Sequence, residues 1–110
     1  MANPLHHAEC LPAKPGEAPL PIAEADSLLE HLDQWTIQAG KYLRKAWAFS
    51  DFQSALNFVN AIGHLAESVG HHPDIALGWG RVEVELTTHD IGGLHRADFI
   101  LAARIDLIEL

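Results

Sequence analysis

The residues that could carry out chemistry in this sequence are one glutamate and three histidines: Glu67, His71, His72 and His89. Imidazole titrates near neutral pH, so a histidine can donate or accept a proton under physiological conditions. A neighbouring carboxylate fixes the tautomer of an imidazole and makes the ring more basic. Elimination of water needs an acid that protonates the leaving hydroxyl and a base that removes a proton from the adjacent atom. The four residues fit such a reaction, although residue types alone do not select it.

A helix followed by a proline is expected to position the first three of these residues. Glu67 and His71 are four residues apart at the end of a predicted helix, so we expect the Glu67 carboxylate to face the His71 ring and orient it. Pro73 disfavours helical backbone at His72, so the two adjacent rings cannot both continue the helix. The loop should therefore present His71 and His72 in different directions.

His89 follows the clearest strand in the sequence. Over residues 81–88, the apolar Val82, Val84 and Leu86 alternate with polar residues, which is typical of a half-buried β-strand. Loops that follow strands often carry the polar groups of a cleft. We therefore expect one carboxylate and three imidazoles to meet at the rim of a sheet.

Hydrophobic periodicity and turn residues predict the other elements. Apolar residues at helical spacing indicate helices, and alternation bounded by Gly or Pro indicates strands. In chain order we expect a helix over 23–33, strands over 35–39 and 42–49, a helix opened by a capping box of Ser50 and Gln53 and ending at Gly70, strands over 74–78 and 81–88, and a helix over 94–107. The order α-β-β-α-β-β-α predicts an α+β two-layer sandwich, with a four-stranded antiparallel sheet and three helices on one face.

The apolar residues of the two longer helices divide into core stripes and a remainder. The stripe of the middle helix is Phe52, Ala55, Leu56, Val59, Ile62, Ala66 and Val69. Phe58, Leu65, Phe99 and Ile108 lie off the stripes, so we expect them to widen the core or to contact a second subunit. A homodimer or homotetramer, formed through the last helix or an open edge strand, is therefore expected.

The composition indicates one small acidic domain with an N-terminal arm. The chain has 110 residues, and we expect residues 22–110 to form the domain and the proline-rich residues 1–21 to be extended or disordered. The formal net charge is −8 and no run of basic residues is present, which argues against nucleic-acid binding through a basic face. No apolar segment reaches the ~18 residues of a membrane-spanning helix. The single Cys10 excludes an intramolecular disulfide, and we do not expect the first residues to act as a signal peptide, because they lack a basic segment followed by an apolar one; we therefore expect a cytoplasmic protein.

Several spaced motifs together resemble those of the pterin-4a-carbinolamine dehydratases. They are Glu67, His71-His72-Pro73, Thr88-His89, Gly93-Leu94 and Asp98, with Trp35 and Asp51-Phe52 upstream. The resemblance covers the whole expected domain, and the family's sheet with three helices on one side agrees with the elements predicted above. It implies a hydro-lyase that dehydrates 4a-hydroxytetrahydrobiopterin, or a related pterin, to the quinonoid dihydropterin. That step recycles the tetrahydropterin cofactor of aromatic amino-acid hydroxylases, which makes such a hydroxylase an expected partner.

The resemblance also implies roles for individual residues. His71, His72 and His89 would be catalytic; Glu67, Thr87, Thr88 and Asp98 would contact the pterin or support the histidines; and Trp35 would border the pocket. No metal and no further cofactor is implied. Animal members often carry Asp just before the histidine pair and an aromatic residue after the proline, where this chain has Gly70 and Ile75.

Two other functions compete with this one. Animal members of the family also bind a homeodomain transcription factor, so the main alternative is a non-catalytic binding or assembly protein on the same fold. The same glutamate and three histidines could instead bind zinc or iron, although adjacent histidines in an extended chain point apart. His6, His7 and Cys10 in the arm are residue types that bind zinc, but they supply only three of the four ligands of a structural zinc site.

The remaining histidines are expected to lie on the surface. His31 and His64 fall on polar helix faces, and His95 is expected to begin the last helix with an exposed ring.

Overall fold

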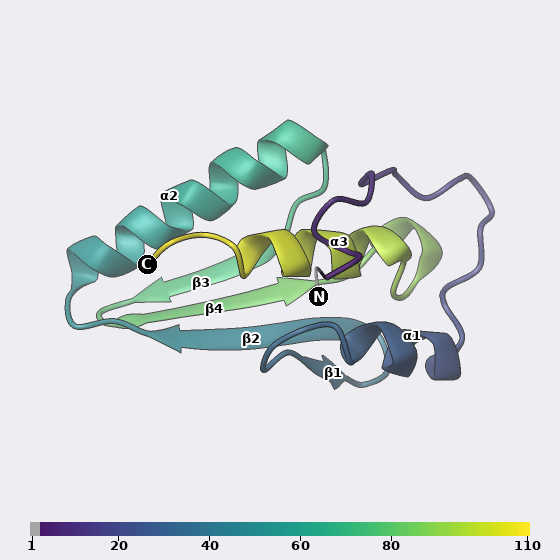
Figure 1. Ribbon diagram of the computed structural model, residues 1–110, viewed down its shortest axis with the longest axis horizontal. Coiled ribbons are helices and arrows are strands. Elements are labelled where there is room, and N and C mark those ends of the chain that lie inside the picture. The colour runs from purple at the N-terminus through teal and green to yellow at the C-terminus, as the bar shows by residue number, and fades with distance from the viewer. Residues whose placement is uncertain (1–2) are drawn as a thin grey trace.

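The alternation of apolar and polar residues builds a four-stranded antiparallel sheet, ordered β1-β2-β4-β3, in the computed structural model, which describes residues 3–110 (Figure 1). In chain order the elements are α1 (Ile22–Leu29), β1 (Thr36–Gln38), β2 (Tyr42–Ala48), α2 (Phe52–Val69), β3 (Asp74–Gly78), β4 (Arg81–Leu86), the 3₁₀ helix η1 (His89–Ile91) and α3 (Arg96–Ile105). The predicted α+β class and order of elements are confirmed.

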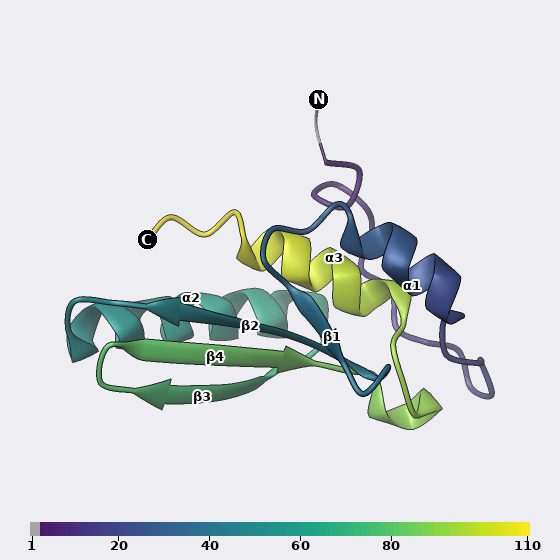
Figure 2. The same cartoon turned by 90° about the horizontal axis from the view of Figure 1, so that it is seen from below.

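One face of the sheet is apolar and the helices cover it, as Figure 2 shows for α1 and α3. Val82, Val84 and Leu86 of β4 are fully buried, and Leu43 of β2 is buried opposite Leu86. The alternate residues of β4 face the other side, where Glu83 is only half-buried. The predicted two-sided pattern of this strand is confirmed, because a period of two directs every second side chain to the core.

α2 begins and ends at residues that satisfy its terminal backbone groups. Its N-cap is Asp51, whose carboxylate accepts a hydrogen bond from the Ser54 backbone N–H at 2.7 Å. That N–H also lowers the pKa of Asp51. The predicted capping box of Ser50 and Gln53 is therefore wrong, since the extended backbone of Asp51 places its own side chain over the first turn. Gly70 ends the helix at φ +68°, as its freedom at positive φ predicts.

Two residues expected off the helix stripes belong to the core. Phe58 is 4% exposed and packs edge-on against Trp47, with ring centroids 4.9 Å apart, and Phe99 is fully buried. Phe52, expected in the stripe, is 44% exposed at the first position of α2. Of the two roles expected for Phe58 and Phe99, the structure shows that they widen the core and leaves them unavailable to a second subunit.

α3 is buried on most of its surface because it is covered from several sides. It contacts β2 and α2, and the N-terminal arm lies along it (Figure 1). The helix begins at Arg96, two residues later than predicted, because His95 is extended and serves as its N-cap. Leu94 nevertheless remains buried, at 2% exposure.

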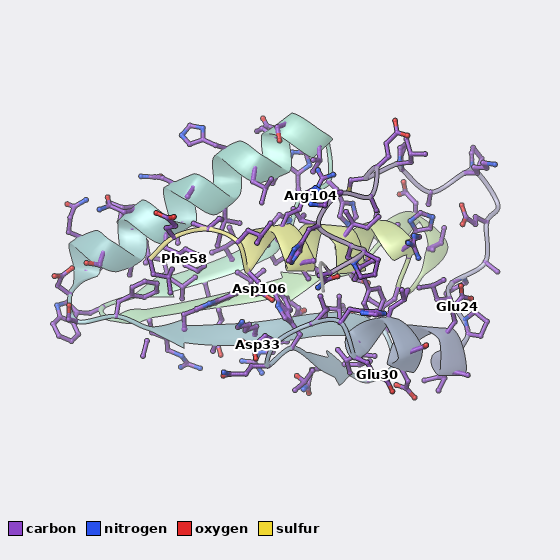
Figure 3. All side chains as sticks on the ribbon, in the orientation of Figure 1. Glu24, Glu30, Asp33, Phe58, Arg104 and Asp106 are labelled. Atoms are coloured by element: carbon purple, nitrogen blue, oxygen red, sulfur yellow. The ribbon has the colours of Figure 1, made fainter. Side chains whose placement is uncertain are left out.

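The proline-rich arm has no helix or strand over residues 3–21, but it packs closely on the domain. Leu5 is fully buried in the core, and the Leu20 backbone N–H donates to the Leu94 carbonyl at 2.9 Å. Arg104, which points toward the arm in Figure 3, donates to the carbonyl of Ala8. The arm thus forms part of the cover of α3. Met1 and Ala2 lie outside the described residues. No helix within residues 3–110 is long and apolar enough to span a membrane.

Candidate active site

The end of α2 and the start of α3 bring a histidine into contact with a buried carboxylate. After the left-handed turn at Gly70 the chain leaves the helix, and the Nε2 atom of His71 lies 2.5 Å from Oδ1 of Asp98 in the first turn of α3. The side chains are 17% and 0% exposed, respectively. His71 is therefore fixed by a carboxylate that water does not reach, while part of its ring remains open to solvent.

Asp98 is held by two further donors. Its Oδ2 atom accepts hydrogen bonds from the Thr88 hydroxyl at 2.8 Å and from the His95 backbone N–H at 2.9 Å. An ionised carboxylate only accepts hydrogen bonds, so the His71 ring donates to it through Nε2–H. In the neutral form of the ring Nδ1 is then the unprotonated nitrogen, and the geometry makes it the candidate proton acceptor.

Glu67 contacts His72 and not His71, so the predicted pairing of Glu67 with His71 is wrong. Oε2 of Glu67 lies 2.7 Å from Nε2 of His72, and the two side chains are 78% and 62% exposed. Side chains four residues apart lie on the same face only while the helix continues. The left-handed turn at Gly70 ends the helix and directs His71 toward Asp98 instead. Exposed pairs of this kind contribute little to stability, so the side chains of Glu67 and His72 can change position. The buried His71–Asp98 pair, in contrast, is fixed.

The loop after β4 connects His89 to the same cluster through the backbone. Thr88, which bonds to Asp98, directly precedes His89, and the Thr88 backbone N–H donates to the Gly93 carbonyl at 2.9 Å. The buried Thr87 hydroxyl donates to the Lys41 carbonyl at 2.7 Å. His89 itself is exposed in η1, and within residues 3–110 its side chain makes no hydrogen bond to the other site residues.

Trp35 lies apart from this cluster. It is 5% exposed, and its indole N–H donates at 2.9 Å to Asp106, the C-cap of α3, which is labelled in Figure 3. Asp106 is eight residues along the helix from Asp98, which corresponds to roughly 12 Å. The contacts of Trp35 are those of a core residue, and its expected contact with the pocket stays a prediction.

The two adjacent histidines bind different carboxylates. His71 contacts Asp98 and His72 contacts Glu67, so the two rings point apart. Among the residues that the structure describes, no group of three or more His, Cys, Asp or Glu side chains is arranged to hold a metal ion. The donor set considered for zinc or iron is therefore not assembled, and metal-free activity stays a prediction.

His95 is a residue whose part in the site the sequence did not reveal. Its ring was expected to be exposed but is only 12% exposed, because Nδ1 accepts a hydrogen bond from the Ala97 backbone N–H at 3.1 Å. Asp98 returns a hydrogen bond to the His95 backbone, which completes a capping box. An acidic residue three positions after a predicted helix start was the available signal, but histidine is an uncommon N-cap.

The fold and this cluster together define a small α+β protein with a histidine–carboxylate pair at the rim of its sheet. Residues 18–108 match the model of the family described as pterin 4 alpha carbinolamine dehydratase. The chain belongs to this family, whose activity is that of a hydro-lyase.

Relatives from several bacteria agree with the family match. A protein of Rubrobacter xylanophilus with the provisional name pterin-4-alpha-carbinolamine dehydratase is 44% identical over 102 residues, which cover 93% of this chain and 95% of that one. One of Chlorobium limicola, with the same provisional name, is 46% identical over 105 residues and 93% of both chains.

Two solved structures share the fold. The crystal structure of a transcriptional coactivator/pterin dehydratase from Brucella melitensis has a TM-score of 0.76 and 28% identity, over 81% of this chain and 96% of that one. A pterin dehydratase-like protein described as a RuBisCO assembly factor in the alpha-carboxysome has a TM-score of 0.58 and 27% identity, over 68% of this chain and 88% of that one.

Proposed function

We propose that this protein dehydrates a 4a-hydroxytetrahydropterin to the quinonoid dihydropterin by histidine acid–base catalysis. The observation that carries the proposal is the His71–Asp98 pair, in which a fully buried carboxylate fixes one nitrogen of a partly exposed ring. Family membership supplies the substrate class, and the pair supplies a base with a defined tautomer.

The reaction needs only two proton transfers. The bond between C4a and its hydroxyl oxygen breaks, and an acid donates a proton so that the hydroxyl leaves as water. A base removes the proton from the adjacent ring nitrogen N5, and the electron pair forms a C4a=N5 double bond. We assign the base to Nδ1 of His71 and the acid to His89, which comes from a separate loop and can approach the substrate from another side. His72, with its ring directed away from Asp98, positions the pterin.

The test is a direct dehydration assay on chemically generated 4a-hydroxytetrahydropterin. His71→Ala and His89→Ala should each lower kcat by about 10²–10⁴-fold, the usual cost of losing a general acid or base. His72→Ala should act more through KM. His64→Ala is the matched control, since His64 is exposed on α2 and bonds to none of these residues. Near wild-type kcat in folded His71 and His89 variants would contradict the proposal.

The proposal includes the partners expected from the family. The product is the precursor of a tetrahydropterin, so the protein would serve an aromatic amino-acid hydroxylase in the cytoplasm. The alternative is a binding or assembly role, such as the one described for the alpha-carboxysome protein that shares this fold. Here the histidine set and its buried carboxylate are intact, which favours catalysis. A wild-type protein without activity in the dehydration assay would favour the alternative.

We also propose that the chain forms a homo-oligomer. Of the four apolar residues first considered, Leu65 and Ile108 remain half-buried at the surface, and Trp79 is 74% exposed beside the edge strand β3. Exposed apolar groups and an open sheet edge are both features that a second copy can cover. Sedimentation equilibrium at micromolar concentration should give a multiple of the 12.1 kDa chain mass, and a stable monomer would refute the idea.

A further inference from the structure

A third histidine–carboxylate pair, His95 with Glu17, adjoins the His71–Asp98 pair at the start of α3. Nε2 of His95 is 3.0 Å from Oε2 of Glu17, which belongs to the N-terminal arm. The other ring nitrogen of His95, Nδ1, accepts from the Ala97 backbone N–H at 3.1 Å and therefore carries no proton. The proton of the neutral ring is thus on Nε2, from which it is donated to Glu17. One tautomer of His95 satisfies both contacts.

The two pairs are joined through the backbone of His95. Its N–H donates to Oδ2 of Asp98 at 2.9 Å, while Oδ1 of the same carboxylate receives the His71 ring. A carboxylate bound at both oxygens cannot rotate without breaking one of these bonds. The hydrogen-bonded path therefore runs from Glu17 through His95 and Asp98 to His71.

Glu17 is held in a defined position by its own segment of the arm. Its Oε1 atom accepts from the Lys14 backbone N–H at 2.8 Å, and the arm is attached again where Leu20 donates to Leu94. The Lys14 N–H is the main cause that lowers the pKa of Glu17, and the His95 ring adds to it. Glu17 is therefore charged at neutral pH and presents a fixed acceptor to His95. Glu17 and His95 both line a cavity between the arm and the start of α3, and the other charged residues around that cavity are Glu9, Lys14, Glu24 and Arg96.

We propose that His95 is a positioning residue for the catalytic pair and that Glu17 of the arm locks its ring, an inference that rests on the proposed function. With the ring locked, the first turn of α3 holds its backbone N–H against Asp98, and Asp98 holds the Nε2–H tautomer of His71. Without the lock, the start of α3 loosens and the His71 ring samples both tautomers. The effect falls on the chemical step and not on pterin binding, because neither residue belongs to the proposed pterin contacts.

The experiment compares Glu17→Ala, His95→Ser and their double variant with wild type and with Glu24→Ala. Serine retains an N-cap oxygen, so His95→Ser keeps the capping hydrogen bond of α3 and removes only the ring contact with Glu17. Glu24→Ala removes a carboxylate that lines the same cavity but makes no hydrogen bond to His95 within the described residues. Two experiments are done on each variant: kcat and KM are measured for dehydration, and the tautomer of the His71 ring is determined by ¹⁵N NMR without substrate.

The Glu17→Ala and His95→Ser variants should each lower kcat by about 3- to 10-fold with KM unchanged, which is less than the cost of losing the base itself. The double variant should lose no more than either single variant, because both changes break one contact. The NMR signals of His71 should show a mixture of tautomers in all three and a single tautomer in wild type and Glu24→Ala. Additive losses, or an unchanged His71 tautomer, would overturn the inference. If wild type lacks dehydratase activity, the NMR result still decides the positioning role, so failure of the proposed function is distinguished from failure of this inference.

Discussion

Replacing Asp98 with asparagine tests the central contact of the site with a change of almost no volume. The carboxylate accepts three hydrogen bonds, from the His71 ring, the Thr88 hydroxyl and the His95 backbone N–H. An amide has one oxygen and one NH₂ group, so it cannot accept at both positions. Asp98→Asn must therefore present its NH₂ group either to the two partners of Oδ2 or to His71.

The first orientation places the NH₂ group against the His95 N–H, a buried donor facing a donor. Such a contact costs about 1–3 kcal/mol, and a backbone N–H cannot become an acceptor. The second orientation places the NH₂ group against Nε2 of His71, which can respond by moving its proton to Nδ1. The second orientation is favoured for this reason, and it protonates the nitrogen that we assign as the base. The same exchange of tautomer explains the large effect of an Asp→Asn change beside the histidine of serine proteases.

We therefore expect Asp98→Asn to lower kcat by about 10²–10⁴-fold, as loss of the base would. Stability should fall by about 1–3 kcal/mol, because charge-assisted hydrogen bonds become neutral ones. The assay is dehydration of chemically generated 4a-hydroxytetrahydropterin, with folding checked by circular dichroism and urea denaturation.

Glu67→Gln is the matched control, because it changes the Glu67–His72 pair, which is largely exposed. Its kcat should stay within about threefold of wild type. A folded Asp98→Asn variant with kcat within about threefold of wild type would refute the tautomer argument.

Four further outcomes are expected. Leu5→Ala should lower the free energy of unfolding by about 2–4 kcal/mol in urea titrations, since Leu5 is fully buried, and an unchanged value would mean that the arm does not pack in solution. Cys10 should react slowly with a chromogenic disulfide reagent at pH 8 until the protein is unfolded, because burial raises the pKa of its thiol above the ordinary 9.0; rapid reaction in the native state would contradict this. Asp51→Ala should lower the melting temperature at pH 7. The folded pKa of Asp51 is lowered, so this stabilisation is present above its ordinary pKa of 3.8 and is lost as pH falls through the folded value; a difference that persists at pH 2 would argue against the cap. Treatment with a strong chelator, with metal loss confirmed by elemental analysis, should leave kcat unchanged, and activity that returns only with zinc or iron would contradict a metal-free mechanism.

Local sequence patterns were enough to predict the fold class and the order of the helices and strands. Alternation over β4 and helical spacing over α2 are local patterns: the first predicts which residues of its strand are buried, and the second predicts the extent of its helix. Gly70 was identified as the end of α2 for an equally local reason, its freedom at positive φ. The motif residues around His71 and Asp98 were found together only because a family resemblance linked them across the chain.

Contacts between residues that are far apart in the chain could not be predicted from local patterns and depend on the packing of the fold. Local spacing favoured Glu67 as the partner of His71. Because the chain turns at Gly70, however, His71 contacts Asp98, which is 27 residues away in the sequence. His95 looked like a surface residue because its partner Glu17 is 78 residues distant in the arm. Periodicity reports which face of an element is apolar, whereas the pairing of buried polar groups depends on how elements pack, since each must find a partner wherever the fold places one.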